Sequence, residues 1–141
     1  MSQRSKVIHD FKSVNLSQSQ LQFTDAGSSI TLGAAESGDI VTLNATSGSA
    51  VTLPSPSTGL LYRFIITNTG PHTLTAPTAC INGAVVNAVF NTGSNLATGA
   101  AKTSIAATAG SVIGDSLTLM GTGTNYFLSG NVSNFNAVKF A

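Results

Sequence analysis

Apolar and polar residues alternate along most of the chain after residue 28. The clearest case is SLTLMGTGTNYFLSG, residues 116–130, where alternation leads up to Leu119 and a Gly, Thr and Asn loop precedes an aromatic-rich run. A period of two places successive side chains on opposite faces of a strand. This stretch therefore predicts two strands joined by a polar turn, and that turn contains no acid, base or metal ligand.

Further alternating runs predict several more strands. DIVTLNA and SAVTLPS each place a valine and a leucine on one face, and the second run stops at Pro54 because proline cannot donate to a strand ladder. LLYRFIITNTG is apolar on both faces, which predicts a central, buried strand. The best helical candidate, the Ala-rich segment 95–110, is weakened by Gly99 and by three threonines. Short strands between Gly- and Pro-rich turns predict an all-β fold, an antiparallel sandwich or a barrel-like domain.

A short pattern, x-V/I-T-L, recurs three times within ITLGAAESGDIVTLNATSGSAVTLP. Each copy has a threonine flanked by two large apolar residues. Simple strand alternation often produces such copies, so a true internal repeat is the less favoured interpretation.

The composition changes near residue 28. Residues 1–28 hold five of the eleven charged residues and the polar stretch SQSQLQF, and charges are sparse after Gly27. We therefore predict an extended N-terminal arm, residues 1–28, and a sandwich or barrel body, residues 29–141. Apolar positions in the arm fit a helix in one part and strands in another, as expected for a segment that orders against a partner.

The low charge content narrows the classes of partner. Charged residues make up 8% of the chain, against about 25% in ordinary globular proteins, and the net charge is +1. A surface of Ser, Thr, Asn and Gly can pack against protein without desolvating many ions. The charge is too small to hold nucleic acid, and no apolar run is long enough to span a membrane. We therefore predict protein partners, with no nucleic acid and no membrane.

Residues that could carry chemistry are few and scattered. His72, Cys80 and Asp115 are better explained as a polar turn residue, a buried or half-buried thiol and a turn former. Glu36 and Asp39 lack the further oxygen ligands of a calcium loop, and no His or Cys spacing fits a metal site. The sequence therefore predicts no catalytic residues, no metal and no cofactor, and a protein that is not an enzyme.

Arg63 is unusual because it lies within the most apolar strand. Such a charge must face water, find a partner or meet another subunit. An exposed strand face is the favoured interpretation, and an intersubunit contact is the alternative.

Residues 37–130 resemble a pattern found in bacteriophage virion proteins. The resemblance is carried by SGDIVTLNATSGSAVTLPSPSTGLLYRFIITNTGPHTLTAP, by INGAVVN and by SLTLMGTGTNYFLSG, in which an aromatic residue, here Tyr126, follows Thr-Asn. The pattern is similar to that of small capsid decoration (cement) proteins and of β-domains of tail fibres. The resemblance implies a β-rich virion module.

Together, the resemblance and the arm predict a decoration protein that stabilises the outer capsid surface of the virion. We expect a homotrimer whose arms lie across adjoining subunits of the major capsid protein, because three linked arms bind at a high effective concentration. The alternative is a tail-fibre or receptor-binding domain that contacts host glycan, with an exposed Tyr126 as a platform for the sugar. The residues expected at the capsid contact are Arg4, Lys6, Phe11 and Lys12, and those expected at the subunit interface are Arg63 and Tyr126.

Overall fold

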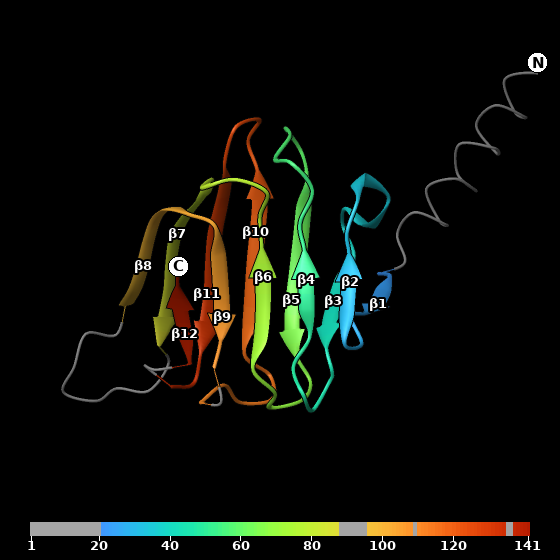
Figure 1. Ribbon diagram of the computed structural model, residues 1–141, viewed down its shortest axis with the longest axis vertical. Coiled ribbons are helices and arrows are strands. Elements are labelled where there is room, and N and C mark those ends of the chain that lie inside the picture. Colours follow the sequence, from blue (N-terminus) through green and yellow to red (C-terminus); the bar gives the residue numbers. More distant parts are fainter. Residues whose placement is uncertain (1–20, 88–95, 109, 135–136) are drawn as a thin grey trace, which may run out of the picture.

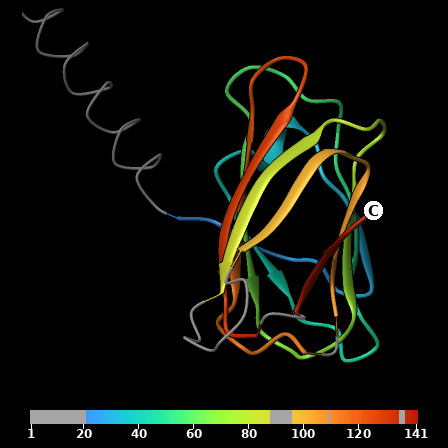
Figure 2. The same ribbon diagram turned by 90° about the vertical axis from the view of Figure 1, so that its left-hand side faces the viewer.

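The computed structural model describes residues 21–87, 96–108, 110–134 and 137–141. In these ranges the chain forms two β-sheets that pack face to face, together with one short 3-10 helix, η1 (Ala34–Glu36) (Figures 1 and 2). The predicted all-β sandwich is confirmed. Both sheets have free edges, so the described strands do not close into a barrel.

Each sheet contains strands from both halves of the chain. The larger sheet has the order β1 (Phe23–Asp25), β3 (Ile40–Leu43), β5 (Leu61–Ile66), β10 (Ser116–Gly121), β11 (Tyr126–Val132), β7 (Ile81–Asn87), β8 (Leu96–Lys102). The smaller sheet has the order β12 (Val138–Phe140), β9 (Ser104–Ala107), β6 (His72–Thr75), β4 (Ala50–Thr52), β2 (Ser29–Thr31).

The first six strands alternate between the two sheets. Strands β1, β3 and β5 lie side by side in the larger sheet, and β2, β4 and β6 lie side by side in the smaller one (Figure 1). Neighbours within each set are parallel, since the chain crosses to the other sheet and back before it returns. This part of the chain therefore winds as a flattened coil with one strand of each turn in each sheet.

The antiparallel pairing expected for the sandwich holds for only part of it. Among the described strands, five of the ten pairings are parallel and five are antiparallel. Four of the five parallel pairs arise because consecutive strands of the coil face each other across the core instead of pairing through hairpins, and the fifth joins β7 to β11. Parallel strands need a long crossover, and here the opposite sheet supplies it.

The recurring x-V/I-T-L pattern has a structural basis in the smaller sheet. Two of its copies, residues 29–32 and 50–53, form neighbouring parallel strands in register, with Ile30 beside Val51 and Thr31 beside Thr52. The third copy, residues 40–43, lies in the larger sheet. Neighbouring parallel strands place equivalent side chains side by side. The repeated x-V/I-T-L pattern therefore corresponds to successive turns of the coil.

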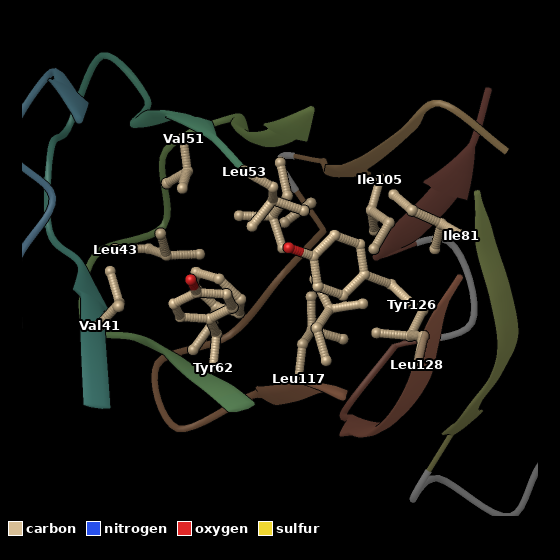
Figure 3. Close-up of a cluster of buried hydrophobic side chains, with 14 of the residues drawn as sticks. Val41, Leu43, Val51, Leu53, Tyr62, Ile81, Ile105, Leu117, Tyr126 and Leu128 are labelled. Carbon is tan, nitrogen blue, oxygen red and sulfur yellow. The ribbon is translucent and has the colours of Figure 1, made fainter. Parts of the chain in front are cut away.

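The core lies between the sheets and is filled by the inward-facing residues of both (Figure 3). The rings of Tyr62 and Tyr126 lie near its centre, with their centroids 6.5 Å apart and their planes tilted by 57°. The Tyr62 hydroxyl donates to the Gly33 carbonyl at 2.7 Å, and the Tyr126 hydroxyl donates to the Pro54 carbonyl at 3.0 Å. Each acceptor directly follows the leucine of one pattern copy, so the two tyrosines fix equivalent crossovers of the coil.

Two stretches of the chain form strands where local composition suggested an arm or a helix. Strand β1 pairs with β3, although it falls inside the predicted arm, residues 1–28. One of the five charged residues of residues 1–28, Asp25, belongs to this strand; it is exposed, and its carboxylate accepts a hydrogen bond from the Thr42 hydroxyl. The Ala-rich segment 95–110 contains strands β8 and β9 rather than a helix.

Candidate functional site

The described residues contain no group of three or more His, Cys, Asp or Glu side chains that could hold a metal ion. The described part of the chain also contains no helix long and apolar enough to cross a membrane. The polar residues considered as candidates for chemistry instead take part in structural hydrogen bonds, as follows.

His72 is fully buried and joins two turns. Its Nδ1 accepts a hydrogen bond from the Ser49 amide at 2.9 Å, and its Nε2 lies 2.6 Å from the Asn68 carbonyl oxygen. An accepting Nδ1 and a carbonyl partner at Nε2 fix the neutral imidazole with its proton on Nε2. His72 is therefore a structural residue at the start of β6.

Asp115 is also buried, and its carboxylate accepts three hydrogen bonds. Oδ2 accepts from the Val112 amide at 2.9 Å, and Oδ1 accepts from the Ser133 amide and hydroxyl at 2.8 and 2.7 Å. It shapes the turn before β10, as predicted, and ties this turn to the end of β11. The Cys80 thiol is buried as well.

Glu36 and Asp39 serve the crossover between β2 and β3. A carboxylate oxygen of Glu36 accepts from the Gly33 amide at 2.7 Å, and one of Asp39 accepts from the Thr24 hydroxyl at 2.8 Å. Both carboxylates thus accept hydrogen bonds within the first turns of the coil. The outer faces of the sheets are the remaining candidates for a binding surface.

The prediction that Tyr126 lies at a subunit interface needs correction. Its side chain has no exposed surface, and its ring is enclosed between the sheets (Figure 3). Burial raises the pKa of the Tyr126 hydroxyl above its ordinary range, with smaller contributions from Tyr62 and Cys80. Tyr126 is a core residue, and the neighbouring aromatic residue, Phe127, is the one that faces outward.

An exposed apolar row crosses the middle of the larger sheet. Leu61 on β5 lies opposite Met120 on β10, and Met120 lies opposite Phe127 on β11. All three point away from the core; Met120 and Phe127 are 52% and 51% exposed, and Leu61 is half-buried. Directly opposed side chains on one face are close enough to touch. We call Leu61, Met120 and Phe127 the apolar row.

Arg63 lies on the same outer face, one step along β5 from the apolar row. It is exposed, as the favoured interpretation of the sequence required, and in the sheet register it is flanked by Ile40 and Thr118. An exposed guanidinium beside an apolar strip suits contact with another protein, where Arg, Met and aromatic residues are enriched. Sequence reasoning identified Arg63 and missed the apolar row.

The row was missed because its residues come from three strands. Alternation over residues 126–132 groups Phe127 with the polar residues Ser129 and Asn131, which marks it as the outward ring of the aromatic pair. A signal was present in Met120, an apolar residue at an outward position of the alternating run 116–120. Pairing β10 with its following run would have placed Met120 beside Phe127.

The outer face of the smaller sheet has a different chemistry. Its outward positions carry small uncharged residues, with threonines at positions 31, 52 and 75 aligned across three strands. Lys139 on β12 is an exposed charge on this face. Large apolar groups therefore gather on the larger sheet, which makes that face the stronger candidate for binding protein.

Residues 1–20 lie outside the described residues, and with them lie the residues predicted for the capsid contact: Arg4, Lys6, Phe11 and Lys12. Comparison of the chain with protein families, with curated protein sequences and with solved structures finds no match.

Proposed function

We propose that this protein is a phage virion structural protein that decorates and stabilises the outer capsid surface. In this proposal the body forms a homotrimer through the outer face of the larger sheet. The arms then contact neighbouring subunits of the major capsid protein through Arg4, Lys6, Phe11 and Lys12. The observation that carries the proposal is the apolar row, an exposed strip of large side chains on a rigid sheet with few charges.

The apolar row supports self-association on energetic grounds. Met120 and Phe127 each leave about half of their surface in water, and burying that half contributes about 1 kcal/mol per side chain. Exposed apolar patches rimmed by polar residues are typical of protein interaction sites. Arg63 beside the row adds a donor group of the kind enriched in protein interfaces.

A threefold ring needs two different surfaces on each copy, because its contacts are heterologous. The described residues offer a second exposed apolar feature in the turn before β10, where Val112 and Ile113 are exposed. Asp115 holds this turn through its bond to the Val112 amide, so the two side chains are presented from a fixed backbone. In our proposal the apolar row of one copy contacts this turn of the next copy.

The solution mass of purified variants tests the trimer. Light scattering on a sizing column is expected to give a trimer for the wild-type chain and a monomer for Phe127→Asp, which places a charge in the apolar row. The matched control is Thr52→Asp, which introduces the same charge at an exposed position of the smaller sheet. A trimer for both variants, or a wild-type monomer, would contradict the proposed interface.

Binding to capsids assembled without this protein tests the arm. The triple variant Arg4→Ala, Lys6→Ala, Lys12→Ala is expected to bind at least about tenfold more weakly, with the loss most marked at low salt. Lys139→Ala removes one exposed positive charge from the body and is expected to bind as the wild type does. Unchanged binding of the triple variant would remove these residues from the capsid contact.

The tail-fibre alternative loses the residue on which it depended, because Tyr126 is inaccessible. Its place could be taken by Phe127, whose sheet neighbour on β7 is Asn82. A glycan-array signal that disappears in Phe127→Asp, with no binding to capsids, would favour this alternative over decoration.

A further inference from the structure

The first turn of the coil leaves an unpaired strand edge in the smaller sheet. Strand β2 pairs with β4 on one side only. The Leu32 amide donates to Thr52 and the Ala50 amide donates to Ser28, so the even-numbered residues of this segment direct their backbone groups toward β4. The N–H and C=O groups of Ser29 and Thr31 therefore point away from the sheet, at its edge.

Two features that normally keep another strand away from a sheet edge, proline and charged side chains, are missing from this one. Its inward residue, Ile30, packs against the core but is only partly buried, whereas its register partner Val51 is fully covered. An added strand with an apolar side chain beside Ile30 would complete the core at this end.

The sequence contains a segment with the pattern that this position requires. Strands β2 and β4 begin with a small residue, a β-branched apolar residue, threonine and leucine, in residues 29–32 and 50–53. Residues 13–16, Ser-Val-Asn-Leu, repeat this order with asparagine in place of threonine. Asparagine at that place is compatible with the outward, solvent-facing position of Thr31.

The spacing to the next strand is also similar, differing by one position. In the coil, Ile40 of β3 follows Leu32 by eight positions, and Leu61 of β5 follows Leu53 by eight. Phe23, which begins β1, follows Leu16 by seven. A strand at residues 13–16 would thus precede β1 in the same way as β2 precedes β3 and β4 precedes β5, with the strands still alternating between sheets.

We propose that the free edge of β2 is a strand-acceptor site and that its ligand is the segment 13–16 of the same chain. The segment adds in parallel, with Val14 beside Ile30 and Asn15 beside Thr31. Residues 13–16 lie outside the described residues, and their assignment rests on pattern, spacing and the edge itself. The six connecting residues span up to about 20 Å, enough to cross a sandwich whose sheets lie about 10 Å apart, so the chain reaches its own edge.

This docking would determine how much of the N-terminal arm is available for the capsid contact. All four residues proposed for the capsid contact precede residue 13, so they would project as a short free segment from the rim of β2. That consequence rests on the proposed function, whereas the docking itself does not. The tests below use the isolated protein, so they can fail or succeed whatever the outcome of capsid binding.

Engineered cysteines test the register and the source of the segment. In the full chain, Asn15→Cys with Thr31→Cys places two cysteines at aligned positions of adjacent strands, within the Cα separation that a disulfide needs. The control Asn15→Cys with Thr75→Cys uses the same outward row three strand spacings away, about 14 Å. The native Cys80 is buried in both variants.

We expect the first pair to form an intrachain disulfide, visible on a non-reducing gel as a faster-migrating monomer, and the control pair to form none. A disulfide-linked dimer would overturn the assignment to the same chain. Equal, low cross-linking of both pairs would overturn the docking.

Amide hydrogen exchange supplies a test without cysteines. The Ser29 and Thr31 amides have no partner in the described sheet, so they are protected only if a strand is added. We expect protection in the wild-type chain and in Val7→Asp, and a loss of at least about tenfold in Val14→Asp, which places a charge beside Ile30. Fast exchange of both amides in the wild-type chain would overturn the proposal.

Discussion

Tyr126 and Phe127 are consecutive residues of β11 and lie on opposite sides of the larger sheet. The Tyr126 side chain has no exposed surface, and the Phe127 side chain is 51% exposed. The first residue contributes to the stability of the sandwich, and the second is available to a partner. Substitutions at the two positions should therefore be separable, one acting on unfolding and the other on association.

Replacing Tyr126 with phenylalanine should lower the free energy of unfolding by about 1–2 kcal/mol, because the Pro54 carbonyl loses its donor inside the protein. Urea unfolding measures this change. The converse substitution, Phe127→Tyr, adds a hydroxyl at an exposed position and should change stability by less than about 0.5 kcal/mol. Equal effects of the two substitutions would contradict the assignment of Tyr126 to the core.

Alkaline pH should destabilise the protein through the buried tyrosines. Burial raises the pKa values of Tyr126 and Tyr62 in the folded state, so the unfolded chain loses these protons first as pH rises. Their contribution to stability is therefore complete below the unfolded pKa of about 10 and is lost above it. Urea unfolding from neutral pH to about pH 11 should show a decline that is shallower in Tyr126→Phe. An identical decline in both proteins would exclude Tyr126 as its cause.

Asp115→Ala should cost about 2–4 kcal/mol of stability, because three donors from Val112 and Ser133 lose a buried charged acceptor. The exposed Asp25 provides the control, and Asp25→Ala should remain within about 1 kcal/mol of the wild type. Thermal unfolding followed by circular dichroism compares them. A small effect at Asp115 would show that the turn before β10 is held by other contacts.

Gly83→Ala should be among the most damaging single substitutions in the body. Gly83 has a φ of 142°, and an added Cβ would lie 2.1 Å from the Leu128 carbonyl oxygen of the adjacent strand. Relieving this contact requires backbone movement, so we expect a loss of about 3 kcal/mol or more, or failure to fold. Gly33→Ala, where the nearest atom is 3.4 Å away and φ is −129°, is the matched control. Similar stability of the two variants would contradict this packing.

Local patterns predicted the strands well. The run LLYRFIITNTG was expected to form a central strand, and β5 lies within the larger sheet between β3 and β10. Its inward residues, Tyr62, Phe64 and Ile66, are buried as the alternation requires. The opposite face is less covered than two apolar faces suggested, since Arg63 is exposed and Leu61 is half-buried. Period-two alternation determines which residues share a face but not whether anything covers it.

The pairing partners of the strands could not be predicted from such patterns. Parallel pairing of β1, β3 and β5 depends on crossovers through the other sheet. Alternation within one strand does not predict these crossovers. The inward direction at Tyr126, by contrast, could have been predicted, because alternation places Tyr126 on one face with Leu128 and places Phe127 on the other with Ser129. The x-V/I-T-L copies did contain information on strand pairing, because two of them form neighbouring strands in successive turns of the coil.

The position of the β10–β11 hairpin determines when the larger sheet can be completed. It lies between β5 and β7, so Arg63 pairs with Thr118 and Gly83 pairs with Leu128, far along the chain in each case. The coil of β1 to β6 can form from nearby residues, but β5 and β7 must each wait with an open edge until residue 132 has been synthesised. Strands that pair across such distances fold slowly and are exposed to aggregation in the interval. The yield of folded protein in cells should therefore depend on how quickly the last quarter of the chain leaves the ribosome and the β10–β11 hairpin pairs between β5 and β7.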